Sequence, residues 1–175
     1  VLANRYAKSL PAGYVEDVSP AVAAEDVRQL SLLSGDNALR MSFYHPPQAP
    51  ETLRFKVYRS GGDIALSEVL PQLENLGLRV LTEHVYEIAA DAPLSIQDFE
   101  VQPVGALTFS VEQVGALFED AFEQIWRGNA ENDGFNRLVL GAKLGWRQVA
   151  MLRGYCKYLL QTGATFSQAY MEETL

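Results

Sequence analysis

Few residues of this 175-residue chain have the types and spacing that chemistry requires. The two histidines, His45 and His84, have no cysteine or second histidine at metal-ligand spacing. We expect His45 to be a loop residue and His84 to be a structural or surface residue. The single cysteine, Cys156, lies in an apolar stretch with no histidine in its half of the chain, whereas a catalytic thiolate needs a nearby base. We therefore predict no catalytic residue and no metal site, and a core position for Cys156.

Four carboxylates lie at the alternating spacing of strand residues. Glu83 and Glu87 would share one face of one strand, and Asp98 and Glu100 one face of another. Paired carboxylates can work as general acid and base. A solvated sheet face explains the same pattern equally well, so both interpretations stay open.

No cofactor motif is present in the sequence. Neither the G-x-G-x-x-G dinucleotide pattern nor the G-x-x-x-x-G-K-[ST] phosphate loop occurs. Gly61 and Gly62 lie between an expected strand and an expected helix, but two glycines in a turn are a weak indication of phosphate binding. We predict no cofactor site in this chain.

Composition narrows the class of protein. Hydrophobic residues make up 48% of the chain, which excludes general disorder, and the formal net charge of -8 argues against nucleic acid or an anionic membrane as partner. No apolar run approaches the roughly 20 residues of a membrane span. A single cysteine fits a reducing compartment. These features predict a soluble, cytoplasmic protein.

Charge is unevenly distributed along the chain. Between Glu83 and Asp133 there are eleven acidic residues and one formal cation, whereas the stretch from Gly134 to Met171 has five basic residues and no acidic one before Met171. We favour the interpretation that the two stretches pair with each other, within the chain or across a subunit contact. A basic groove for a phosphate-bearing ligand or RNA is the alternative.

Hydrophobic periodicity predicts an α+β fold. Apolar residues recur at helical spacing or alternate at strand spacing, with glycine-rich turns between the segments. The expected helices cover residues 20–33, 66–76 and 111–127, and the expected strands cover 39–44, 53–58, 79–89 and 96–102. The alternation in 39–44 and 53–58 predicts one buried face for each of these two strands. Strands 39–44 and 53–58 should pair as a hairpin. The predicted core is an α+β sandwich of order ββαββα, a permuted ferredoxin-like or ACT-like unit with flanking helices and a C-terminal helical segment.

The C-terminal stretch predicts one long helix over residues 135–161 and a second helix after Thr162-Gly163. Its apolar residues cover so much of the surface that we expect it to be largely buried. Gly141 and Gly145, four residues apart, would form a groove on it where another helix, of the same chain or of another subunit, could pack closely.

Several tracts carry a family resemblance: FNRLVLGAKLGWRQVAMLRGYCKYLLQTGATFSQAYMEETL, ALRMSFYHP with LRFKVYRSG, LSEVLPQLENLGLRVLTEHVYEI, and FEDAFEQIWRGNAENDGFN. They resemble the segment before the catalytic domain in the large bacterial NAD-specific glutamate dehydrogenases. The resemblance implies a helical lead-in over 1–35, an ACT-like domain over 36–128 and a helical bridge over 129–175. We expect the chain to be a piece of a larger protein, because it begins without methionine inside helical sequence at residues 1–6.

The resemblance implies a function for the larger protein, the NAD-dependent oxidation of L-glutamate to 2-oxoglutarate and ammonium. This chain would then be a non-catalytic regulatory and assembly segment, inactive alone, which contacts other domains and subunits of a homo-oligomer through Trp146, Arg147 and Tyr155. An amino-acid-sensing ACT-like domain is the second interpretation, with candidate ligand turns at Ser60, Gly61, Gly62 and Asp63 and at Asn75 and Gly77. A free-standing interaction module is the third.

Overall fold

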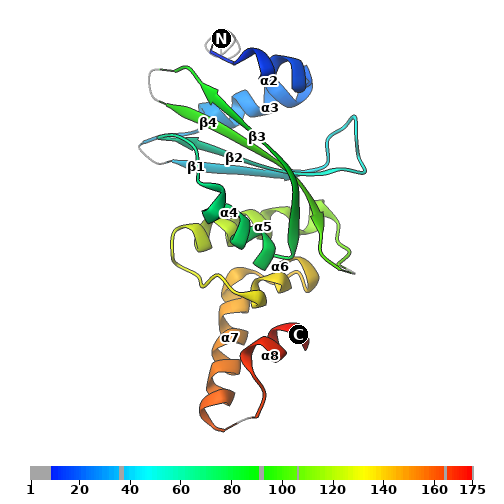
Figure 1. Ribbon diagram of the computed structural model, residues 1–175, viewed down its shortest axis with the longest axis vertical. Coiled ribbons are helices and arrows are strands. Elements are labelled where there is room, and N and C mark those ends of the chain that lie inside the picture. Colours follow the sequence, from blue (N-terminus) through cyan, green and yellow to red (C-terminus); the bar gives the residue numbers. More distant parts are fainter. Residues whose placement is uncertain (1–8, 36–37, 91–92, 106, 164, 175) are drawn as a thin grey trace. The chain divides into compact units, whose positions relative to one another are not determined.

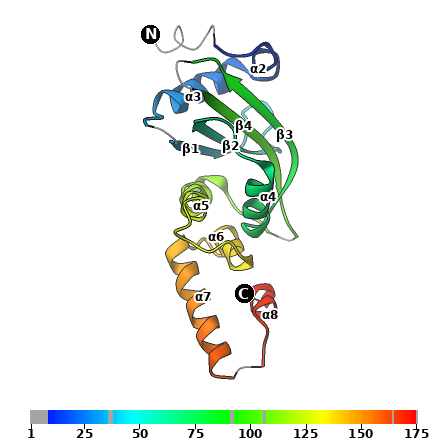
Figure 2. The ribbon, with the colours of Figure 1, turned by 60° about the vertical axis from the view of Figure 1, so that its left-hand side comes forward.

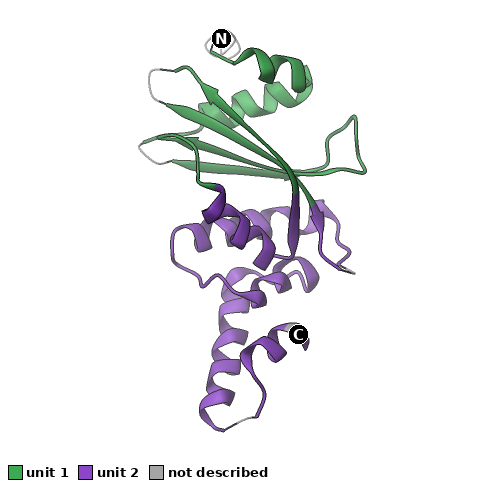
Figure 3. Ribbon diagram, in the orientation of Figure 1, with its two compact units in different colours: residues 1–65, 81–101 green, residues 66–80, 102–175 purple. Residues whose placement is uncertain are grey.

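The computed structural model describes the chain in two compact units (Figure 3), formed by residues 1–65 with 81–101 and by residues 66–80 with 102–175. The described residues are 9–35, 38–90, 93–105, 107–163 and 165–174. The helical sequence expected at residues 1–6 lies outside this part of the chain.

A four-stranded sheet contains β1 (Leu39–Tyr44), β2 (Leu53–Ser60), β3 (Leu78–Ile88) and β4 (Leu94–Pro103) in the order β1-β2-β4-β3 (Figure 1). Strands β1 and β2 form the expected antiparallel hairpin, and β2 also pairs antiparallel with β4. Helix α4 (Leu66–Asn75) follows β2 along the chain, and α5 (Val111–Trp126) follows β4. The α+β class and the order ββαββα are therefore confirmed.

Strand β2 is buried on both faces, so the expected single buried face is wrong for it. Phe55 and Val57 are buried as alternation predicts, but Lys56 and Tyr58, which point to the opposite face, are buried as well. The reason is helix α3 (Pro20–Ser31), which contacts β1 and β2 on the face of Lys56 and Tyr58. A helix that covers a polar strand face cannot be deduced from the alternation of that strand.

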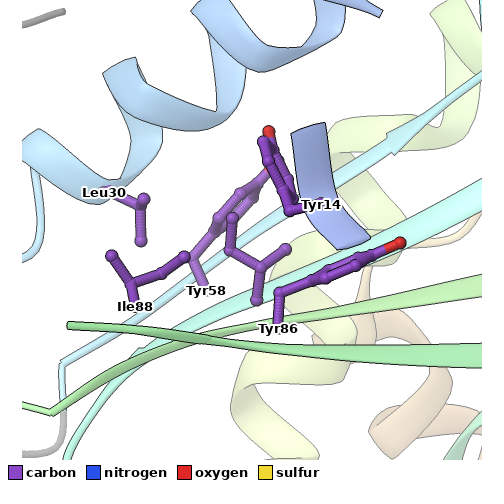
Figure 4. Close-up of a cluster of buried hydrophobic side chains, with 6 residues drawn as sticks. Tyr14, Leu30, Tyr58, Tyr86 and Ile88 are labelled. Carbon is purple, nitrogen blue, oxygen red and sulfur yellow. The ribbon is translucent and has the colours of Figure 1, made fainter. Parts of the chain in front are cut away.

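Helices α2 (Ala12–Asp17) and α3 contribute to a cluster of buried hydrophobic side chains in the first unit. Figure 4 shows Tyr14, Leu30, Tyr58, Tyr86 and Ile88 of this cluster gathered between helices and strands. The rings of Tyr14 and Tyr86 meet edge to face, with centroids 5.1 Å apart. Such pairs add about 0.5–1.5 kcal/mol to what area burial alone contributes.

The second unit is mainly helical. After α5 it contains the 3-10 turn η1 (Gly134–Arg137) and the helices α6 (Leu138–Gly141), α7 (Trp146–Gln161) and α8 (Gln168–Thr174). Helix α5 buries an i, i+4 stripe that includes Val114, Phe118 and Phe122. It packs against α4, α6 and α7, while η1 contacts α4, α6, α7 and α8.

The single helix expected over residues 135–161 is wrong, because the chain is not helical from Ala142 to Gly145. Lys143 takes a left-handed backbone conformation with φ of 56°, which no helix interior accepts, and its Nζ donates to Gln113 Oε1 at 2.6 Å. Gly145 is then the N-cap of α7, and its N–H donates to Gln148 Oε1 at 2.9 Å. The two glycines therefore mark a helix end and a helix start rather than a groove on one helix.

Gly77 ends α4 with φ of 87°, and a Cβ built there would lie 2.8 Å from Leu107 Cδ1. Gly128 after α5 has φ of 73° and open space around it. We expect Gly128→Ala to cost about 1–2 kcal/mol, the usual penalty of left-handed backbone in an L-residue. Gly77→Ala should cost more, because Leu107 must also move; urea unfolding of both variants measures the difference. Equal losses would show that Leu107 gives way freely.

Candidate functional site

A buried carboxylate lies at the centre of the first unit. Asp26 of α3 is 1% exposed and Lys56 of β2 is fully buried. Asp26 Oδ2 accepts hydrogen bonds from Lys56 Nζ and from Tyr14 Oη, both at 2.6 Å, while Oδ1 accepts from Tyr58 Oη at 2.6 Å. Buried charges are tolerated only when paired and hydrogen-bonded, and this carboxylate meets that condition with three donors.

The charged cluster continues along the same sheet face into β4. Asp98 is 3% exposed, and its Oδ2 lies 3.4 Å from Lys56 Nζ. Arg54 binds Asp98 through two nitrogens, at 2.9 Å from Oδ1 and 2.9 Å from Oδ2, and reaches Glu100 at 3.5 Å. A solvated sheet face is therefore wrong for Asp98. Asp98 instead forms a bidentate ion pair with Arg54. Glu83 accepts a hydrogen bond from Gln97 Nε2, and Glu87 is exposed.

This cluster changes the ionisation of its tyrosines. Burial, followed by the negative charge of Asp26, raises the pKa of Tyr14 and of Tyr58 well above the ordinary value. Burial and the charge of Asp98 raise the pKa of Tyr44 as well. Tyr86, which donates to Asp17 Oδ2 at 3.0 Å, has its pKa raised to about 12, mainly by burial.

A pocket of about 300 Å³ opens beside the cluster, within the first unit. Its charged side is formed by Arg54, Lys56 and Asp98. Its remaining walls come from the end of α2, from the turn before α3 and the start of α3, and from the β1–β2 hairpin: Asp17, Val18, Ser19, Val22, Tyr44, Pro46, Gln48, Ala49 and Thr52. Pockets of this size accept small molecules.

The first candidate ligand turn, Ser60 to Asp63, already has its hydrogen bonds made within the protein. Ser60 Oγ donates to the carbonyl of Gly35 at 2.8 Å and accepts from the amide of Ala38 at 2.9 Å. The Gly61 amide donates to Pro93 O at 2.8 Å, and the Gly62 carbonyl accepts from Ser95 Oγ at 3.0 Å. The carbonyl of Asp63 accepts from Arg59 at 2.9 Å, and its side chain is exposed.

The second candidate turn belongs to the other unit. Asn75 Nδ2 donates to Asn132 Oδ1 at 3.0 Å, and the Gly77 carbonyl accepts from the amide of Val104 at 2.9 Å. These contacts tie the end of α4 to two connectors of its own unit. A ligand role for either turn stays a prediction.

The candidate interface residues lie on α7. Arg147 is exposed and stacks on the half-buried ring of Trp146, with its guanidinium carbon 4.4 Å from the ring centroid, and Tyr155 is 61% exposed. The expectation of a largely buried helix is wrong for α7, because only Val149, Arg153 and Cys156 are buried on it. Cys156 thus has the core position expected of it.

Two of the three basic residues of α7, Arg153 and Lys157, pair with the acidic connector that precedes η1, as the favoured interpretation of the charge pattern predicts. Arg153 binds Asp133 at 2.6 Å and donates to Asn136 Oδ1 at 2.8 Å. Lys157 binds Glu131 at 2.6 Å in an exposed pair. These two cations therefore hold α7 to the rest of its own unit.

Both histidines are exposed. His45 Nδ1 lies 2.6 Å from the carbonyl oxygen of Thr52, and the ring of His84 stacks on Tyr86 with centroids 6.2 Å apart. Within the described residues, no three histidines, cysteines or carboxylates come close enough to hold a metal ion. Over the same ranges, no helix has both the length and the apolar character to cross a membrane.

The centre of the site, Asp26 with Lys56, was not predicted from the sequence. One signal was present: Asp26 lies between Ala23 and Leu30 in the apolar stripe of the expected helix, where a charged residue needs a buried partner. The partner could not be found, because alternation assigns Lys56 to a solvent face.

Three family models match consecutive parts of the chain. "Glutamate dehydrogenase, helical motif 2" matches residues 1–33, "Glutamate dehydrogenase, ACT3 domain" matches 38–114, and "Glutamate dehydrogenase, helical motif 3" matches 130–175. The α+β sheet unit is thus an ACT-type domain between two helical motifs.

Named relatives agree with these matches. The chain is 40% identical to the NAD-specific glutamate dehydrogenase of Halomonas elongata and 43% identical to that of Pseudomonas aeruginosa, each over its whole length. It is 32% identical over 99% of its length to that of Mycobacterium tuberculosis. The chain belongs to the NAD-specific glutamate dehydrogenase family, and it spans about 11% of the length of these relatives.

Removing the central carboxylate should strongly destabilise the first unit. We expect Asp26→Ala to cost about 3–5 kcal/mol, because it takes the nearest counter-ion from buried Lys56. Glu25→Ala, which removes an exposed partner of Arg28 on the same helix, is the matched control and should change little. Urea unfolding measures both. A small loss for Asp26→Ala would mean that Asp98 alone suffices for Lys56.

Alkaline pH should destabilise the fold through the buried tyrosines. In the unfolded chain they ionise near pH 10, whereas in the folded chain the pKa values of Tyr14, Tyr44 and Tyr58 are raised above that. Above a pH of about 10 the unfolded state therefore loses more protons than the folded state. The free energy of unfolding keeps its full value below that pH and falls as the pH rises further. Tyrosinate absorbance against pH measures this, and Tyr58→Phe should make the fall shallower. Ionisation of all eight tyrosines near pH 10 in the folded protein would contradict it.

Proposed function

We propose that this chain is a non-catalytic regulatory and assembly segment of an NAD-specific glutamate dehydrogenase. The larger enzyme would oxidise L-glutamate to 2-oxoglutarate and ammonium with NAD, in parts of the protein outside this segment. The membership of the family and the 11% span of the relatives support this division of labour. The single observation that carries the assembly role is the exposed apolar face of α7.

This face is a stripe of large side chains at helical spacing. Met151, Tyr155 and Tyr158 are 56%, 61% and 63% exposed, and Leu159 beside them is 49% exposed. Exposed apolar patches of this kind mark interaction sites, and tyrosine is one of the residue types that most often contribute strongly to binding. We therefore define the α7 face as Arg147, Met151, Tyr155, Tyr158 and Leu159.

The opposite side of α7 fixes how the helix is presented. Arg153 is buried, and it binds Asp133 through two nitrogens at 2.6 and 2.8 Å. Val149 and Cys156 are buried on the same side. Figure 2 shows α7 as a long helix that is joined at its end to α8. A helix held along one side offers its other side without the entropic loss that a loose helix would suffer on binding.

The division of the chain into segments is part of the proposal. A helical lead-in over residues 1–35, an ACT-like domain over 36–128 and a helical bridge over 129–175 correspond closely to the matched ranges 1–33, 38–114 and 130–175. The α7 face lies in the bridge. Other domains or subunits of the same enzyme are the partners that we propose for it.

Loss of the α7 face should weaken assembly of the longer enzyme. We expect Tyr155→Ala with Tyr158→Ala to weaken subunit or domain association by about 30-fold or more, the effect of losing a strong interface residue, or to change cooperativity with glutamate. Mass by light scattering across a concentration range, with glutamate saturation curves, measures this. Val15→Ala, at a similarly exposed apolar residue of α2, is the control. Unchanged mass and unchanged kinetics would contradict the proposal.

A further inference from the structure

We propose that strand β3 pairs antiparallel with β3 of a second copy of this chain, about a twofold axis at Glu83. The order β1-β2-β4-β3 leaves β3 at one edge of the sheet, with β4 as its only strand neighbour among the described residues (Figure 2). The inference rests on the assembly role proposed above, to which it adds a partner and a surface. No residue of the α7 face takes part in it.

The edge strand β3 is long and open to solvent. It runs over Leu78–Ile88, and neither proline nor glycine interrupts it. On one face of the strand, Leu81 and Val85 are 48% and 42% exposed. On the other face, Thr82 and His84 are exposed. Edge strands in proteins are usually short, interrupted or covered, because an open row of backbone N–H and C=O groups attracts another strand. A strand is therefore the partner that this edge fits.

Symmetry limits the registers that two copies can adopt. In an antiparallel pair about a twofold axis, one residue lies opposite its own copy, and the residues that flank it lie opposite one another. Glu83 is the midpoint of β3, so an axis there gives every residue of the strand an opposite residue. Leu81 then lies opposite Val85 of the second copy. Arg79 lies opposite Glu87 of the second copy.

Both of these cross-strand pairs are complementary. Leu81 and Val85 withdraw exposed apolar surface from water, while Arg79 and Glu87 carry opposite charges. Within the described residues, neither Arg79 nor Glu87 has an ion pair or a side-chain hydrogen bond. Eight positions along a strand separate them by roughly 26 Å, so they can pair with each other only between copies. This local attraction is needed, because two copies with a formal net charge of -8 repel each other overall.

Other registers lack this match. With Thr82 on the axis, Leu81 would lie opposite the carboxylate of Glu83. With His84 on the axis, Leu81 would lie opposite that of Glu87. Registers centred further from the middle of the strand leave four or more residues of β3 without an opposite residue. The register centred on Glu83 thus uses the whole strand and pairs apolar with apolar and cation with anion.

The cost of this register lies at the axis, where the two Glu83 carboxylates lie opposite each other and repel. Gln97 of β4 donates to Glu83 Oε1 at 3.1 Å, which draws each carboxylate toward its own sheet and reduces that repulsion. Glu83→Gln removes the repulsion and should strengthen the pairing about threefold. A weaker dimer in this variant would contradict the placement of the axis.

Sedimentation equilibrium of this chain measures the pairing, and we expect a dimer whose share grows with concentration. Arg79→Glu and Glu87→Arg should each weaken the dimer about tenfold, because like charges then lie opposite each other at both ends of the paired strands. The double variant should return to within about threefold of the unaltered chain. Glu51→Arg, at an exposed residue, is the control for the change in net charge and should not weaken the dimer. A monomer at every concentration, or a double variant that stays weak, would overturn the proposal.

A cysteine at the axis tests the register directly. Glu83→Cys should form a disulfide between copies under mild oxidation, because the two cysteines would lie opposite each other with Cα atoms about 4.5–5.5 Å apart. Val85→Cys is the matched control, since it would lie roughly 14 Å from its own copy and should not cross-link. Buried Cys156 is common to both variants. Cross-linking that is absent in both variants, or equal in both, would overturn the assignment.

The α7 face and the β3 edge are tested separately. Tyr155→Ala with Tyr158→Ala alters the α7 face alone and should leave the dimer of this chain unchanged. If the dimer is lost in that variant and persists in Arg79→Glu and in Glu87→Arg, association belongs to the α7 face and the β3 proposal is wrong.

Discussion

The buried pair of Asp26 and Lys56 is the interaction on which the first unit depends. Lys56 lies in the middle of a strand on the sheet face that α3 covers, and its side chain is fully buried, so its charge needs a partner inside the protein. Asp26 supplies that partner from α3, and the same carboxylate accepts from Tyr14 of α2. Three separate segments of sequence thus meet at one group. A shift of β2 by one residue would turn Lys56 to the other face, so the pair also fixes the register.

Much of the ACT-type core could be predicted from the sequence, because its elements are set by local signals. Alternation in β1 and β2, the leucine stripe of α4 and the glycine turns at Gly61-Gly62 and Gly77 act over a few residues. The break before α7 could not be predicted in the same way. Lys143 has no local reason to leave the helical conformation, and its bond to Gln113 of α5 joins residues thirty positions apart. The glycines flanking it were visible, but their meaning depended on that tertiary contact.

The candidate site was harder to predict than the fold, for a related physical reason. Alternation separates residues into two faces but does not say which faces are covered. It assigned Lys56 to solvent and left a solvated face as one of two interpretations for Asp98. Helix α3 covers that face, so residues with ordinary surface chemistry become a buried ionic cluster. A buried ion pair can be recognised in a sequence only where a charged residue, such as Asp26, occupies a position in an apolar stripe. The pocket beside them follows from the meeting of α3 with the β1–β2 hairpin, which only the tertiary structure provides.

The same device recurs in the second unit with a different result. Arg153 is a buried cation held by Asp133 and Asn136, as Lys56 is held by Asp26 and Asp98. In the first unit the covering helix leaves a small open pocket, whereas α7 is held along one side and leaves a row of aromatic and aliphatic side chains exposed. Keeping such a row in water forgoes about 25 cal/mol for each Å² of apolar surface that a partner could bury. A charged anchor on one side and an uncovered apolar stripe on the other are together the physical basis for assigning α7 to assembly.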